Sequence, residues 1–70
     1  MNMFEIAIFN REVRDLIAEG EHHKQLKDSW ADLNYIEIRA DNATEAKRKI
    51  FKRYPEEKGF EISQVIESIY

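Results

Sequence analysis

The chain has 70 residues, of which 43% are hydrophobic and 36% charged, and its formal net charge is −3. This length provides surface for one modest core, so we expect a single domain over residues 1–70, and the composition is typical of a folded protein. There is no cysteine, which excludes a disulfide framework and a thiolate zinc site and fits a reducing compartment.

A strand is predicted at "MFEIAIF", residues 3–9, because apolar residues alternate along it. Its inward set is Phe4, Ile6 and Ile8. A helix follows, since Asn10 is a good N-cap and Gly20 is a plausible C-terminal stop. The apolar positions of this helix are Val13, Leu16 and Ile17.

Residues 21–34 have the least regular pattern. Leu26, Trp30 and Leu33 stand at helical spacing, which favours an irregular or helical segment. The alternative is a weak strand at "HHKQLK" that pairs with the strand after it.

The clearest strand is "YIEIRA", residues 35–40. Its inward positions are Ile36, Ile38 and Ala40, and its outward positions are Tyr35, Glu37 and Arg39. A helix is predicted over residues 42–54, with Asn42 as N-cap, Glu45 at capping-box spacing and Pro55 as the stop. Its apolar stripe is Ala43, Ala46, Ile50 and Tyr54.

A last strand begins at "FEI", with Phe60 and Ile62 inward, and residues 65–70 either stay extended or form a turn of helix. This order predicts an α+β fold, a two-layer sandwich with two main helices on one face of a small three- or four-stranded sheet. If residues 21–34 supply a strand, the arrangement becomes ferredoxin-like; otherwise it is a truncated variant.

The segment "YIEIRADNATEAKRKIFKRYP", together with the "FEI" that follows, resembles a layout seen in small phage and bacterial α+β proteins, some anti-CRISPR proteins among them. The shared features are a strand ending in Ala, a capped helix with "EA" in its first turn, and a short closing strand. The resemblance covers residues 35–62. It implies a small regulatory or inhibitory protein that acts through its surface, and it assigns no functional residue.

Five basic side chains are concentrated in "KRKIFKR" within an otherwise acidic chain, namely Lys47, Arg48, Lys49, Lys52 and Arg53. They spread over the exposed arc of the predicted helix and complement its dipole, as expected of a solvated face. The alternative is that they contact a nucleic-acid backbone. Base-specific recognition is not expected, because no recognition signature accompanies them.

The sequence contains little that indicates a metal site or an enzyme active site. Asp15, Glu19 and His22 would share a helical face only if the first helix continued past Gly20, so we expect no metal site. No nucleophile elbow or phosphate-binding glycine loop is present. We therefore expect a protein without catalytic residues or a cofactor.

The remaining candidates form a protein-binding surface of Trp30, Tyr35, Glu37 and Arg39, because Trp, Tyr and Arg are enriched at binding hot spots. For Trp30 the alternative is that it closes one end of the core. We expect an interaction protein that binds an unidentified protein, or a second copy of itself, through an open sheet face or a strand edge. The sequence "MNMFEIAIFNREVR" places its charges after its apolar run, the reverse of a secretory signal, and no run has the roughly 20 apolar residues of a membrane span, so we expect a cytoplasmic protein.

Overall fold

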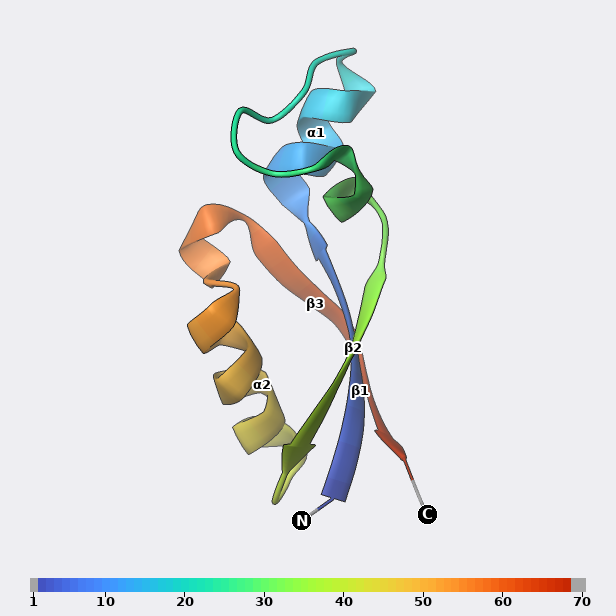
Figure 1. The fold of residues 1–70 in the computed structure, drawn as a ribbon, viewed down its shortest axis with the longest axis vertical. Helices are drawn as coiled ribbons and strands as arrows, with labels where there is room; N and C mark the ends of the chain where they lie inside the picture. The colour runs from blue at the N-terminus through green and yellow to red at the C-terminus, as the bar shows by residue number, and fades with distance from the viewer. Residues whose placement is uncertain (1, 69–70) are drawn as a thin grey trace.

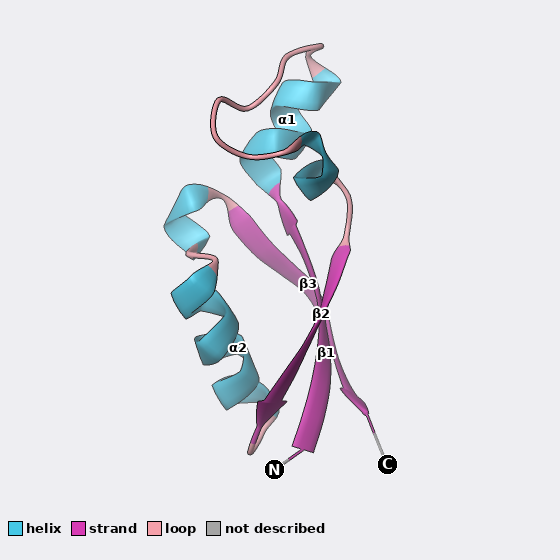
Figure 2. Cartoon of the chain, viewed as in Figure 1, coloured by secondary structure: helices cyan, strands magenta, loops and turns pink. Residues whose placement is uncertain are grey.

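Three strands and two helices make up the computed structural model of the protein, which describes residues 2–68 (Figure 1). The strands are β1 (Asn2–Asn10), β2 (Asn34–Ala40) and β3 (Phe60–Ser68). The helices are α1 (Arg11–Ala18) and α2 (Ala43–Arg53), and two short 3-10 helices, η1 (Asp28–Ala31) and η2 (Glu56–Lys58), lie in the connections (Figure 2). The α+β class is confirmed.

The strands form one antiparallel sheet in the order β2-β1-β3, so β1 is central and the other two are edge strands. The alternation predicted for β1 is confirmed, because Phe4, Ile6 and Ile8 are all buried in the core. On β2 the predicted inward residues Ile36 and Ile38 pack against this core. The sequence pattern thus identified correctly which face of the sheet is covered.

A register shift interrupts the pairing of β1 with β3. Ala7 lies opposite Gln64 while Ile8 lies opposite Ile62, so the intervening residue of β3 has no partner, as in a β-bulge. As a result, Val65 packs on the core beside the predicted Ile62. The strand stays extended through residue 68, and residues 69–70 lie outside the described part of the chain.

The two helices occupy different positions (Figure 1). Helix α2 contacts all three strands and buries Ala46 and Ile50 against the sheet. Helix α1 instead begins at the residue directly after β1 and lies beyond the end of the strands, packed mainly against η1. The arrangement with both helices on one face is therefore observed for α2 only, because α1 has no connecting loop in which the chain could turn back.

Residues 21–33 form a loop that contains η1, and β2 begins at Asn34, which confirms the irregular or helical alternative for this segment. Residues 2–68 contain three strands, so the truncated variant of the predicted fold is the observed one. Within the same residues, no helix is long and apolar enough to cross a membrane.

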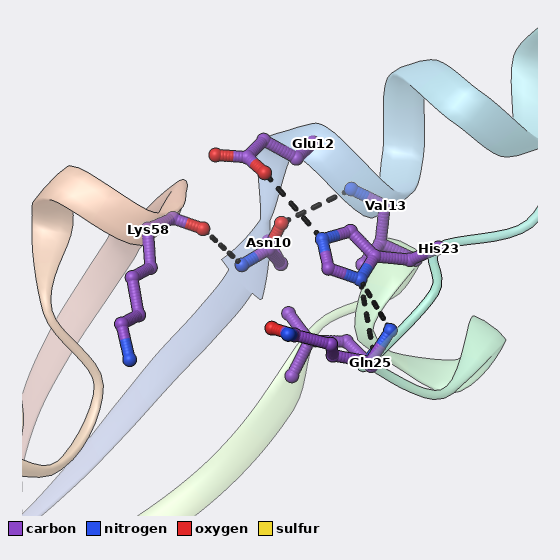
Figure 3. Close-up of polar contacts among 7 residues, drawn as sticks. Asn10, Glu12, Val13, His23, Gln25 and Lys58 are labelled. Atoms are coloured by element: carbon purple, nitrogen blue, oxygen red, sulfur yellow. Dashed lines mark hydrogen bonds and ion pairs between the residues drawn. The ribbon is translucent and has the colours of Figure 1, made fainter.

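Asn10 holds the end of β1 to its surroundings (Figure 3). Its Oδ1 accepts a hydrogen bond from the Val13 N–H at 3.0 Å, as predicted for an N-cap, and its Nδ2 donates to the Lys58 carbonyl at 3.0 Å. The backbone adds a bond from the Arg11 N–H to the Gly59 carbonyl at 2.7 Å. These contacts fix α1 relative to the turn before β3.

Candidate functional site: the β2 edge and the basic helix

On the face of the sheet opposite to α2, β2 presents three of the predicted protein-binding residues. Tyr35, Glu37 and Arg39 are all exposed, and Tyr35 retains 60% of its accessible surface. They project on the same side because side chains alternate along a strand. Their cross-strand neighbours on β1 are Ala7, Glu5 and Met3, respectively.

The far end of this face is closed by α1. The Arg14 guanidinium lies 3.7 Å from the centre of the Phe9 ring, a cation–π contact that covers the last outward residue of β1 before Asn10. The part of this face that α1 leaves uncovered includes Tyr35, Glu37 and Arg39.

Trp30, the fourth predicted protein-binding residue, lies in an aromatic cluster. Its ring centroid is 5.2 Å from that of Tyr54 and 5.1 Å from that of Phe60, and the latter pair of rings meets edge to face. Such contacts stabilise a core edge beyond the area they bury. Trp30 thus packs against the core, as its alternative interpretation predicted, and it is half-buried instead of standing beside Tyr35.

The five basic residues of α2 do not form a single surface. Lys47, Arg48, Lys52 and Arg53 are exposed, as the helical pattern predicted. Lys49 is held in place, because its Nζ donates to the Arg39 carbonyl at 2.8 Å and lies 3.3 Å from Glu45 Oε1.

The predicted pairing of Glu45 with Lys49 has an electrostatic effect. The Lys49 ammonium, which is hydrogen-bonded to the carboxylate, holds the pKa of Glu45 below its usual range. The Asn42 side chain also caps α2 as expected, with its Oδ1 accepting from the Glu45 N–H at 2.8 Å. Both contacts fix the first turns of α2 beside β2.

A shallow groove of about 500 Å³ lies between the edge of β2 and the flank of α2, and we call it the β2-edge groove. Its lining residues are Glu37, Ile38, Arg39, Lys49, Lys52 and Arg53. It brings together residues that the sequence placed in two separate candidate sites. Two residues of the protein-binding set and three of the nucleic-acid-binding set line one surface.

The sequence contained a signal for this groove. Only two residues, Asp41 and Asn42, connect β2 to α2, so the helix must turn back along the strand. A helix rises about 1.5 Å per residue and a strand about 3.3 Å per residue. The middle of α2 therefore returns to the level of Glu37, which lies near the middle of β2.

A second hollow, of about 420 Å³, lies where the 21–33 loop faces the end of α2, and we call it the Trp30 hollow. Trp30, Tyr54 and Phe60 are among its lining aromatics, and charged residues including Glu12 and Arg53 also line it. Arg53 lines both hollows. Sequence reasoning missed this hollow because its walls come from segments far apart along the chain.

His23 has structural partners on α1 and in its own loop (Figure 3). His23 Nδ1 accepts from the backbone N–H groups of Gln25 and Leu26 at 3.0 and 3.1 Å, and its Nε2 lies 3.4 Å from Glu12 Oε1. This hydrogen bonding places the proton of the neutral ring on Nε2. His23 therefore fixes the 21–33 loop to α1.

His22 pairs with Asp28, whose Oδ2 lies 2.9 Å from its Nδ1. Helix α1 ends at Ala18, so the continuous helical face that would have aligned His22 with Asp15 and Glu19 does not form. Across residues 2–68, no group of three or more His, Asp or Glu side chains is placed to hold a metal ion.

Comparison with known proteins found no matching family model, no similar curated protein and no similar solved structure.

Proposed function

We propose that this chain is a small, non-catalytic, cytoplasmic interaction protein that binds another protein along β2 and acts as a regulator or inhibitor. The observation that supports this function best is the exposure of Tyr35, Glu37 and Arg39 on an edge strand. The resemblance of residues 35–62 to small phage and bacterial α+β proteins points in the same direction.

The chemistry of these side chains suits protein recognition. Tyr and Arg bury a large area while retaining polar groups that can hydrogen-bond, which is why they are frequent at binding hot spots. Tyr35 stands opposite Ala7, a small residue, so one side of its ring is not covered by a large cross-strand neighbour. An edge strand also offers backbone groups to a partner.

The experiment compares partner capture by the wild type and by Tyr35→Ala/Arg39→Ala. A matched control is Lys24→Ala/Lys27→Ala, which also truncates two exposed side chains but leaves the sheet unchanged. Circular dichroism and thermal melting establish that each variant is folded. We expect the sheet variant alone to lose the partner, and the proposal is wrong if the folded sheet variant keeps every partner of the wild type.

The second candidate function is binding to a nucleic-acid backbone through the basic helix 42–54. It is favoured by the exposure of Lys47, Arg48, Lys52 and Arg53. Gel mobility shifts at low and moderate salt test it, with Arg48→Glu/Lys52→Glu as the control, because phosphate contacts weaken steeply as salt rises. An absence of any shift at low salt would exclude this alternative.

Self-association is the remaining outcome, in which the partner is a second copy of this chain. Sedimentation equilibrium of the wild type and of Tyr35→Ala/Arg39→Ala separates it from binding to a different protein. A dimer that the double substitution dissociates would place the proposed surface at a symmetric interface.

A further inference from the structure

We propose that the β2-edge groove takes an extended, acidic peptide segment of the partner, which adds to β2 as a fourth strand. This rests on the proposed function and specifies the chemistry of its partner. The argument depends on the charge of the groove, the direction of the β2 backbone and the spacing of the basic side chains.

The groove is strongly basic in a chain of net charge −3. Four of its lining residues are basic and one, Glu37, is acidic. Among residues 2–68, the ion pairs include Lys49 but none of Arg39, Lys52 and Arg53. Within the described residues, these three exposed cations line the groove without forming an ion pair, and the groove carries more positive than negative side chains, which favours an acidic ligand.

The backbone of β2 is available to a partner on the same side. Lys49 reaches the Arg39 carbonyl from α2, so we infer that this carbonyl points away from β1. Backbone groups point alternately to the two sides of a strand, which directs those of Tyr35 and Glu37 the same way. An added strand can pair with these groups, and its N–H can replace the Lys49 ammonium at the Arg39 carbonyl.

The spacing of the cations matches an extended peptide. Side chains three or four residues apart on a helix, such as Lys49 with Lys52 or Arg53, lie about 5–6 Å apart. Alternate side chains of a strand repeat at about 7 Å on one side. Acidic residues at every second position of the added strand would therefore meet the α2 flank, while the residues between them lie beside Tyr35 and Arg39.

A nucleic-acid backbone matches these features less well. It cannot form a strand ladder with the β2 backbone. Lys47 and Arg48 lie outside the groove, so the cations of α2 do not form one continuous phosphate track.

The probes are four capped synthetic octapeptides: acidic TEVEVEVT, neutral TQVQVQVT, basic TKVKVKVT, and the acidic sequence N-methylated at alternate residues to block strand pairing. NMR shifts of the Tyr35, Glu37 and Arg39 amides follow binding. We expect the acidic peptide to bind about tenfold more tightly than the neutral one, because several exposed ion pairs each contribute modestly. The basic and N-methylated peptides should not shift these amides.

Two charge reversals of equal size on α2 provide the matched comparison. Lys52→Glu/Arg53→Glu alters the groove and should make the basic peptide the preferred one. Lys47→Glu/Arg48→Glu alters the same helix outside the groove and should leave the acidic preference in place. Equal effects of the two variants would overturn the proposal, as would binding of the N-methylated peptide, or a DNA duplex that shifts the same amides at lower concentration than the acidic peptide.

The peptide experiment tests the acidic-strand proposal and the capture experiment tests the proposed function, so each can be refuted without the other. If Tyr35→Ala/Arg39→Ala loses its protein partner but no acidic peptide shifts the β2 amides, the acidic-strand proposal is wrong and the proposed function stands. If the acidic peptide binds the groove but that variant keeps every partner, the proposed function is wrong and only the preference of the groove remains.

Discussion

Replacing Asn10 with alanine removes two hydrogen bonds from a side chain that is fully buried. One bond caps α1 at the Val13 N–H, and the other joins β1 to the Lys58 carbonyl. Val13 is itself buried, so its N–H cannot simply turn to water once the cap is lost. The substitution therefore tests whether this junction stabilises the whole fold or only the first turn of a short helix.

The loss of unfolding free energy caused by Asn10→Ala can be estimated from the two hydrogen bonds. Loss of an N-cap acceptor costs about 0.5–2 kcal/mol, and burial places this site toward the upper end of that range. Loss of the bond to the Lys58 carbonyl adds about 1 kcal/mol. The sum is roughly 2–3 kcal/mol, a large share of the roughly 4–10 kcal/mol by which a domain of this length is normally stable.

Urea unfolding followed by circular dichroism measures this loss as a lower midpoint at an unchanged m-value. Asn42→Ala is the matched control, because Asn42 caps α2 in the same way but is exposed, and it should cost about 1 kcal/mol. Asn10→Ser should recover the cap but not the bond to Lys58. Equal destabilisation by Asn10→Ala and Asn42→Ala would refute the view that burial and the second bond make Asn10 special.

Three further substitutions test other contacts. Gly59→Ala should lower the free energy of unfolding by about 2–4 kcal/mol in a thermal or urea melt, because the φ of Gly59 is +97° and a Cβ would meet two side-chain atoms at 2.9 Å. Gly20→Ala is the control: Gly20 has a φ of +78° but lies in open space, so the substitution should cost only the backbone strain of about 1–2 kcal/mol. An NMR titration should show that the pKa of Glu45 lies below its usual range and that Lys49→Met returns this pKa toward the usual range. Because the pKa of Glu45 is lower in the folded than in the unfolded state, the Glu45–Lys49 pair stabilises the fold at neutral pH, and this stabilisation is lost as the pH falls through the folded pKa. His23→Ala should speed hydrogen exchange at the two backbone amides that its Nδ1 accepts, with unchanged exchange in the sheet.

The parts of the fold that local chemistry determines were predictable from the sequence. The helix predicted over 42–54 is observed at Ala43–Arg53, because an Asn cap and a following proline act within a few residues of where they stand. The strand predicted at 35–40 is observed at Asn34–Ala40, since alternation reports directly on which face is buried.

The parts that depend on distant contacts were not predictable in the same way. The β3 bulge exists because of its register against β1, and nothing in "FEISQVIES" alone marks Ser63 as the extra residue. The main packing partner of α1 is η1, which lies in the least regular segment of the sequence. The strand order likewise follows from pairing that alternation cannot specify.

The basic residues of α2 show why the candidate site needed both kinds of information. Lys52 and Arg53 lie in the last turn of the helix, where positive charge is favoured by the dipole whether or not anything binds. Lys49 is likewise accounted for by its contacts with Glu45 and with the Arg39 carbonyl. Arg39 has no such explanation, because it stands on a strand and has no ion-pair partner among residues 2–68. Arg39 lines the β2-edge groove together with Lys49, Lys52 and Arg53 of α2. The distinction between a solvated helix face and a binding surface therefore depends on Arg39.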